Sequence, residues 1–225
     1  AIDMHQTVLA DRTRVLGPDY PDTLTTRSNL AAAYQEAGNV STAIDMHQAL
    51  LNDAIRLLGP NHPHTLTTRR DLAVARLKMG NAPRAIDMLE ALLPHMEQIL
   101  GPDYPDTLAT RNNLAAAYQE AGNVSTAIAK HQALLTDCTR VLGPDHPYTL
   151  GTRINLAGAH YAAGDLQATI DTYEALLPDL TRVFGPDHPY AHTTRNNLAA
   201  ARKKTQQASS PHTDGEAESA PPPES

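Results

Sequence analysis

The dipeptide Gly-Pro occurs five times at intervals of 42 residues, and this spacing constrains the fold more than any other feature of the chain. The surrounding residues also recur, as "LGPDYPDTLTTRSNLAAAYQEAGN" and again as "LGPDHPYTLGTRINLAGAHYAAGD". A period of this length predicts an array of repeated supersecondary units rather than one large core. The five copies begin at Gly17, Gly59, Gly101, Gly143 and Gly185.

Residues 17–58 show how one unit is built. The Gly-Pro step is a helix stop, because glycine tolerates the left-handed conformation and proline cannot continue a helix. Pro21 suits the first position of a new helix, and apolar residues then recur at three- and four-residue spacing until Gly38. Asn39 is a good N-cap for a second helix. Each unit is therefore expected to hold a helix A, a tight turn and a helix B of about 18 residues.

The order of residues within a unit resembles the tetratricopeptide repeat (TPR). Leu30, Tyr34 and Ala43 match the TPR pattern L-G-x-x-Y followed by Ala, although Arg replaces the usual Trp and Ala the usual Gly. The unit length and the wording "LGPDHPxTLxTRxNLAxAY" resemble the kinesin-light-chain-like TPR subfamily, over residues 1 to about 204. Many bacterial members of that subfamily follow NB-ARC-type signalling NTPase domains. This chain contains no Walker motif G-x-x-x-x-G-K-[ST].

The resemblance implies an all-α fold, a right-handed α-solenoid of antiparallel helix pairs. We expect the array to span residues 1–204 and an acidic, Pro-rich, disordered tail to span 205–225. Residues 1–6 equal residues 43–48, so the chain begins inside a helix B. This predicts a fragment of a longer array with an open apolar edge that could self-associate. The expected parts are a half repeat 1–16, units one to four at about 17–58, 59–100, 101–142 and 143–184, and a closing half repeat 185–204.

Composition excludes several functional classes. The formal charge of −7 provides no basic footprint for nucleic acid, and no apolar run has the length of a membrane span. Cys138 stands alone, which suits a reducing cytoplasm and rules out a disulfide framework. No HExxH motif, glycine-rich phosphate loop or nucleophile–base grouping is present, so we expect neither an enzyme nor a cofactor.

The concave groove is assigned by the resemblance, because helix A lines it in TPR proteins. An asparagine or aspartate precedes each buried leucine of helix A, and Asn is a poor residue for a helix interior. One interpretation is that these amides bind the main chain of an extended peptide, as the matching Asn does in peptide-binding TPR proteins. The alternatives are bonds to the neighbouring repeat or inheritance by duplication. The candidate groove residues are Asn29, Asp71, Asn113, Asn155 and Asn197, with Ser28, Arg70, Asn112, Asn196, Gln35, Gln119 and Lys203.

Other repeated residues are interpreted as structural. An arginine row that starts at Arg27 is predicted to reach a carboxylate or a loop carbonyl across adjacent helices. His47 and His131 fall at a core position of helix B, and no metal site is expected. Pro94 and Pro178 are predicted to kink or break their helices. The other members of the arginine row are Arg69, Arg111, Arg153 and Arg195.

These patterns favour a non-enzymatic scaffold whose groove binds a peptide or partner protein. Arg70 and Asp71 interrupt the asparagine row and could select the charge of a ligand, and Lys203 could receive a peptide carboxylate. The alternative is a ligand-sensing or regulatory arm of an NB-ARC-type NTPase or transcription regulator.

Overall fold

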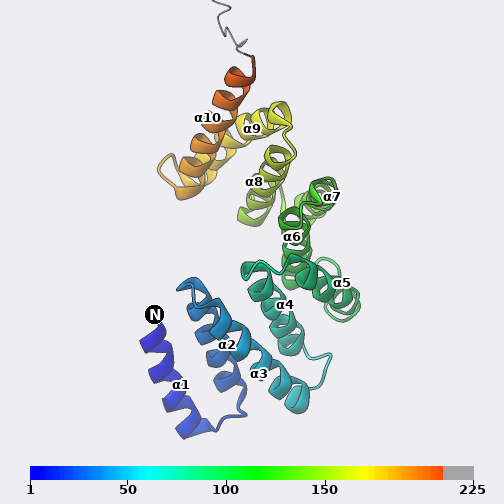
Figure 1. Ribbon diagram of the computed structural model, residues 1–225. Coiled ribbons are helices and arrows are strands. Elements are labelled where there is room, and N and C mark those ends of the chain that lie inside the picture. The colour runs from blue at the N-terminus through cyan, green and yellow to red at the C-terminus, as the bar shows by residue number, and fades with distance from the viewer. Residues whose placement is uncertain (210–225) are drawn as a thin grey trace, which may run out of the picture.

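A computed structural model describes residues 1–209 and shows ten helices, with no strand in that range. Each helix packs against the next one along the chain, and the pairs stack into a curved array (Figure 1). The predicted all-α solenoid is confirmed. The helices are α1 (Ile2–Leu16), α2 (Pro21–Glu36), α3 (Val40–Leu58), α4 (Pro63–Lys78), α5 (Ala82–Ile99), α6 (Pro105–Glu120), α7 (Val124–Leu142), α8 (Pro147–Ala162), α9 (Leu166–Phe184) and α10 (Pro189–Ser209).

The Gly-Pro turns act as predicted, and the sequence analysis missed one of their components. Gly17 has a φ of 95°, which favours glycine, and α2 begins at Pro21. In units two and four the residue before the helix is His62 or His146. Its Nδ1 accepts a hydrogen bond from the backbone N–H two residues later, at 3.2 and 3.1 Å. These histidines therefore cap α4 and α8.

The core is a series of small layers between consecutive helices. Leu24, Leu66 and Leu150 are fully buried, and His47 and His131 are only 2 % and 1 % exposed, as predicted for a core position. By contrast, α1 has no buried residue, and Met4 and Val15 on it are 62 % and 65 % exposed.

Two expectations about helix ends need correction. The last helix was predicted to stop near Lys204, but α10 continues to Ser209, so residues 205–209 do not belong to the predicted tail. No glycine or proline occurs between Lys204 and Pro211, so the sequence contains no signal that would end the helix at Lys204. Residues 210–225 of that tail lie outside the described part. Of the predicted kinks or breaks at Pro94 and Pro178, the breaks do not occur, since α5 and α9 run through these prolines, and the kinks stay a prediction.

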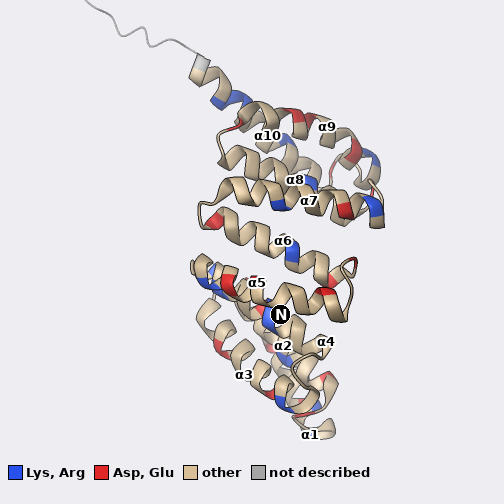
Figure 2. Cartoon of the chain, turned by 90° about the vertical axis from the view of Figure 1, so that its right-hand side faces the viewer, with Lys and Arg blue, Asp and Glu red and all other residues tan. Residues whose placement is uncertain are grey.

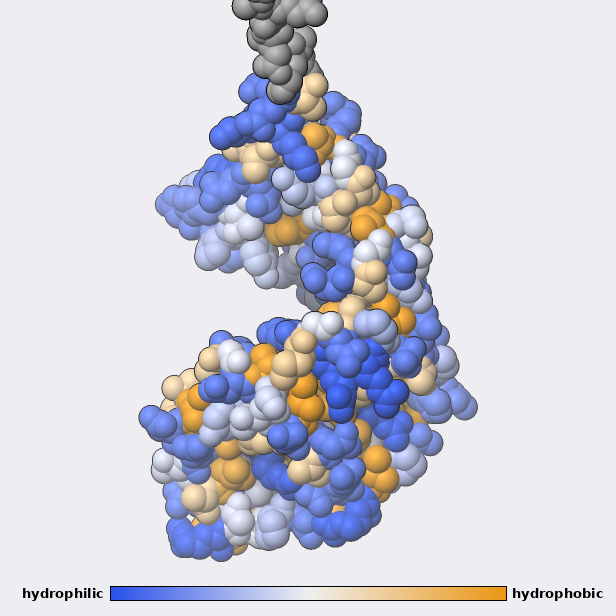
Figure 3. Space-filling model, viewed as in Figure 1, coloured by the Kyte–Doolittle hydropathy of each residue, from blue (hydrophilic) through white to orange (hydrophobic). Residues whose placement is uncertain are grey.

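The even-numbered helices form the inner side of the curve. Within the described chain α4 contacts α6, and α6 contacts α8, across the repeat boundaries. The space-filling view shows a hollow between the body formed by α1–α4 and the body formed by α8–α10 (Figure 3). None of the described helices combines the length and apolarity that a bilayer crossing requires.

Candidate functional site

All twelve predicted groove residues lie on the even-numbered helices, and none of them is buried. Asn29, Asn155 and Asn197 are exposed, whereas Asp71 and Asn113 are half-buried. The side chains of Asn29 and Asn113 make no hydrogen bond to any residue between 1 and 209. Their amide groups are therefore available to a ligand in the groove.

Other members of the asparagine row already bond to neighbouring elements. Asn155 Nδ2 on α8 donates to Asn112 Oδ1 on α6 at 2.9 Å, which joins two repeats. Asn197 Nδ2 on α10 donates to the Tyr173 hydroxyl on α9 at 3.3 Å. The row is thus divided between amides that bridge helices and amides that remain unpaired, and peptide binding by the unpaired members stays a prediction.

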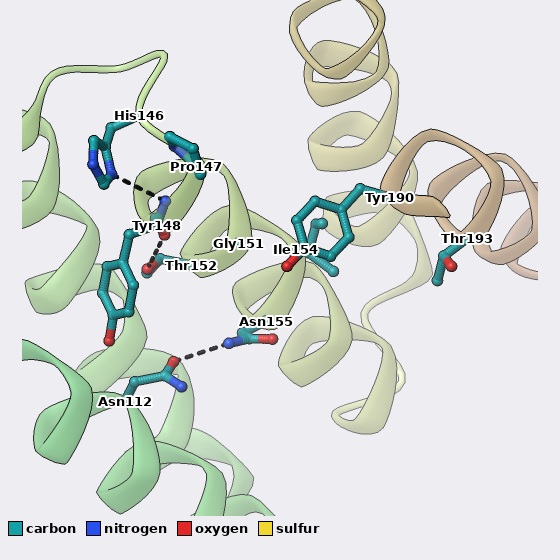
Figure 4. A pocket seen from close by; sticks show the side chains of 10 residues that line it. All are labelled: Asn112, His146, Pro147, Tyr148, Gly151, Thr152, Ile154, Asn155, Tyr190 and Thr193. Carbon is teal, nitrogen blue, oxygen red and sulfur yellow. Dashed lines mark hydrogen bonds between the residues drawn. The ribbon is translucent and has the colours of Figure 1, made fainter. Parts of the chain in front are cut away.

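A pocket of about 610 Å³ lies in the hollow between α6, α8 and α10. Figure 4 shows Ile154 on α8 close to Tyr190 on α10, with the bonded pair Asn112 and Asn155 nearby. The wall mixes apolar and polar groups, which is typical of sites for organic ligands or side chains. Its lining is Asn112, His146, Pro147, Tyr148, Gly151, Thr152, Ile154, Asn155, Tyr190 and Thr193.

Gly151 occupies the interior of α8 without a packing reason. A Cβ added there would meet no atom within 4 Å, so the helix does not need glycine for close contact. Thr25, Thr67, Ala109 and Thr193 stand at the matching positions of the other repeats. Glycine costs about 1 kcal/mol relative to alanine in a helix interior. Its presence enlarges the pocket, and the sequence analysis missed this residue although its mid-helix position marked it.

A second pocket, of about 190 Å³, lies in the groove between α2 and α4, with His47 of α3 among its lining residues. Four of the predicted residues, Ser28, Asn29, Gln35 and Asp71, line it. Sequence reasoning brought these four to one surface but did not predict that His47 would join them. Burial lowers the pKa of His47 below its ordinary value, and the Asp71 carboxylate opposes this shift in pKa.

Arg70 ties this pocket to the next repeat. Its guanidinium donates to Asp71 Oδ1 at 3.1 and 3.0 Å and to Asp106 Oδ1 on α6 at 2.5 Å. These bonds hold the pKa of Arg70 above its ordinary value against the opposing effect of burial. The predicted interruption of the asparagine row is therefore an ion-paired link between α4 and α6.

Each of the four lysines lacks an ion-pair partner among the described residues. Lys78, Lys130, Lys203 and Lys204 make no ion pair within residues 1–209. Lys204 Nζ lies 4.8 Å from the centre of the Tyr161 ring, a cation–π contact between α10 and α8. Lys203 is exposed beside it on α10. The role of Lys203 in receiving a peptide carboxylate stays a prediction.

The arginine row is structural, as predicted, at four of its five positions. Arg27, Arg111 and Arg153 each pair with an aspartate on helix B of their own unit, at 2.8, 2.9 and 2.6 Å. Arg195 donates to the carbonyl oxygen of Pro186 at 2.6 Å. Arg69 makes no ion pair with the described residues, a difference that sets unit two apart.

Residues 1–209 contain neither a metal-binding cluster nor an exposed thiol. That range contains no group of three His, Cys, Asp or Glu side chains placed to hold a metal ion. Cys138 is fully buried, and burial raises the pKa of its thiol, which disfavours the reactive thiolate.

Comparisons with known proteins agree with this geometry. Four overlapping segments of the chain match the family described as tetratricopeptide repeat, at residues 1–52, 29–98, 73–136 and 106–178. A Podospora anserina structure described as a putative kinesin light chain with nearly identical TPR-like repeats is 26 % identical, with a TM-score of 0.70. The alignment covers 84 % of this chain and 89 % of that one. No curated protein sequence matches the chain.

A second solved structure supports the fold alone. BtubC (BKLC) from P. vanneervenii is 16 % identical, with a TM-score of 0.71, and the alignment covers 100 % of this chain and 97 % of that one. The family match extends over residues 1–178, well beyond half of the chain. The chain belongs to the tetratricopeptide repeat family.

Proposed function

We propose that the protein is a non-enzymatic scaffold that binds an extended peptide, or an extended segment of a partner protein, along its concave groove. The supporting observation is Gly151, a helix-interior glycine whose missing side chain opens the 610 Å³ pocket between α6, α8 and α10. Ile154, Tyr148 and Tyr190 line that pocket, so it suits an apolar side chain of the ligand.

The free amides of Asn29 and Asn113 supply the second part of the proposal. An amide side chain can both donate to and accept from the main chain of an extended peptide. Main-chain recognition gives affinity for many sequences, while the pocket at Gly151 selects among them. The bonded pair Asn112 and Asn155 forms a fixed edge of that pocket rather than a free contact.

Filling the pocket tests this proposal without threatening the fold. We expect Gly151→Leu to weaken binding of peptides selected from a random dodecamer library at least tenfold. The same change should raise helix stability by up to about 1 kcal/mol, because leucine replaces a helical glycine. Fluorescence anisotropy gives the affinity and thermal unfolding gives the stability.

Gly158→Ala is the matched control, because Gly158 lies on the same helix but does not line the pocket. It should raise helix stability while the selected peptides keep their affinity. Unchanged affinity in Gly151→Leu, with the protein folded, would remove the pocket from the proposed function.

A further inference from the structure

The smaller pocket between α2 and α4 is lined mainly by polar side chains. Ser28, Asn29 and Gln35 on α2 supply a hydroxyl and two amides, which can both donate and accept hydrogen bonds, and Asp71 on α4 adds a carboxylate, which only accepts. None of the first three makes a side-chain hydrogen bond to any residue in the range 1–209. A ligand that donates hydrogen bonds can be received by all four side chains, whereas one that only accepts them finds no donor at the Asp71 carboxylate.

The Asp71 carboxylate has one oxygen to spare. Both bonds from Arg70 go to Oδ1, at 3.1 and 3.0 Å, and Oδ2 has no partner among the described residues. The side chain is 29 % exposed, so the free oxygen is partly withdrawn from water. Carboxylate oxygens in such surroundings form strong, charge-assisted hydrogen bonds with a cationic donor.

The local charge also favours a cation. Arg70 is the one guanidinium bonded at this place, and it is shared between the carboxylates of Asp71 and Asp106. Two negative charges against one positive charge leave a net charge of about −1 at neutral pH. The free oxygen of Asp71 would repel an anionic group that enters the pocket, whereas a cation would neutralise the net negative charge.

His47 contributes an unpaired ring nitrogen. It is 2 % exposed, and its Nδ1 is buried without a hydrogen-bond partner. A buried polar atom that lacks a partner is costly, so a ligand or water that reaches it gains more than a surface contact would give. Because the ring is neutral at pH 7, it does not repel a cation.

Units three and four carry nearly the same lining between them but arrange it differently. Asn155 stands where unit two has Asp71, and Asn112 stands where unit one has Ser28. These two asparagines bond to each other at 2.9 Å, so an amide pair that joins two helices stands where the first pair of units has a hydroxyl and a carboxylate. His131 repeats His47, with its Nδ1 also unpaired. The chain thus contains its own control for the smaller pocket between α2 and α4.

We propose that the pocket lined by Ser28, Asn29, Gln35, His47 and Asp71 is a subsite for a primary ammonium group. A lysine side chain or a peptide N-terminus carries such a group, with three N–H donors and no acceptor. The proposal deepens the peptide-binding function proposed above and rests on it for the source of the ammonium group. The pocket itself can be probed without any peptide.

The direct test titrates the full chain, labelled with 15N in its histidine rings, with n-butylammonium chloride at pH 7.5. We expect the His47 ring signals to shift with a saturable, millimolar dependence and the His131 signals to stay in place. 1-Butanol and sodium butyrate, which share the alkyl chain, should cause no saturable shift. Equal shifts at both histidines, or equal shifts with butanol, would overturn the proposal.

Two variants make the test specific. Asp71→Asn removes the carboxylate, and Ser28→Asn copies the residue found in unit three, so each should weaken butylammonium binding at least tenfold. Circular dichroism checks that both remain folded, as expected because Arg70 keeps its bond to Asp106. In the converse double variant Asn112→Ser/Asn155→Asp, the His131 signals should respond. Wild-type affinity in Asp71→Asn would contradict the proposal.

Library-selected peptides distinguish the two ammonium sources. Replacing lysine by norleucine tests the side chain, and acetylating the N-terminus tests the chain end. If either change weakens binding at least tenfold in the wild type but not in Asp71→Asn, the subsite belongs to the groove. Binding of butylammonium without any peptide binding would refute the scaffold and leave the subsite standing. Peptide binding that neither change affects, without butylammonium binding, would refute only the subsite.

Discussion

Unit two fixes its second helix differently from units one, three and four. In those three units an aspartate on helix B, such as Asp53, accepts hydrogen bonds from an arginine of helix A and from another arginine one turn later. The second arginine, Arg56 in unit one, also reaches Asp19 in the preceding turn at 3.1 Å. Basic and acidic segments accordingly lie side by side near the ends of α7 and α9 (Figure 2).

Unit two has lost every member of this set except Arg69. His95, Gln98 and Asn61 stand at the positions of Asp53, Arg56 and Asp19. Its charges lie elsewhere: Arg70 bonds to Asp71 and Asp106 on the groove side, and Glu97 bonds to Arg111 of the next unit at 2.6 Å. One repeat can therefore exchange its internal ion pairs for links to its neighbour, and so place charge in the groove.

The largest effect on stability is expected at a core position of helix B. Units one and three have a histidine there, His47 and His131, whereas unit two has Leu89. Burial lowers the pKa of His131 to about 4, whereas an unfolded histidine has a pKa near 6.5. Because the unfolded chain then binds more protons, stability should fall as the pH drops from 6.5 to 4, by about 3 kcal/mol from His131. Urea unfolding at pH 7 and pH 4 measures this loss.

The variant His131→Leu, which copies unit two, isolates this effect. Its free energy of unfolding should fall by about 3 kcal/mol less than that of the wild type over the same pH interval. An unchanged pH dependence would mean that His131 is protonated, or accessible to water, in the folded protein.

A smaller effect is expected from the ion pairs. Asp53→Ala leaves the half-buried Arg27 without its partner at 2.8 Å and should destabilise the array by about 1–2 kcal/mol. The hydrogen bond from Arg27 is the main cause that lowers the pKa of Asp53, so this stabilisation is present above pH 4 and is lost as the carboxylate is protonated. Urea unfolding at pH 7 provides the measurement.

His95→Ala, the matched change in unit two, should have an effect near zero, because His95 is exposed and contacts only the Ala91 carbonyl of its own helix. The converse variant His95→Asp, which offers Arg69 a carboxylate, should gain less than about 1 kcal/mol. Equal losses from Asp53→Ala and His95→Ala would break the distinction between the units.

The fold could be predicted from sequence because its determinants are local and repeated. Gly17 and Pro21 fix a turn and a helix start by their own backbone preferences, and the 42-residue period repeats that choice along the chain. The helix end at Ser209 was missed because the repeat offers no precedent beyond Lys204. The continuity through Pro94 and Pro178 was missed because both prolines lie on exposed positions of helices that packing holds together.

The site was predictable only in part. The resemblance brought Asn29, Ser28 and Asp71 to one surface, but single-residue patterns cannot show that Asn112 and Asn155 would bond to each other across two repeats. Pairing of this kind depends on the distance between helices, which follows from packing rather than from spacing in the sequence. Gly151 is unusual in sequence because it is a glycine inside a helix. Only the structure shows that the space beside it is open and that the missing side chain enlarges the pocket.

The central claim is that ligands bind on the concave side of the array. Backbone amide chemical-shift mapping with a library-selected peptide tests it most directly. We predict that the shifts concentrate on the groove faces of α2, α4, α6, α8 and α10, including Asn113 and Gly151. Shifts confined to α3, α5, α7 and α9, with the even-numbered helices unaffected, would contradict the account.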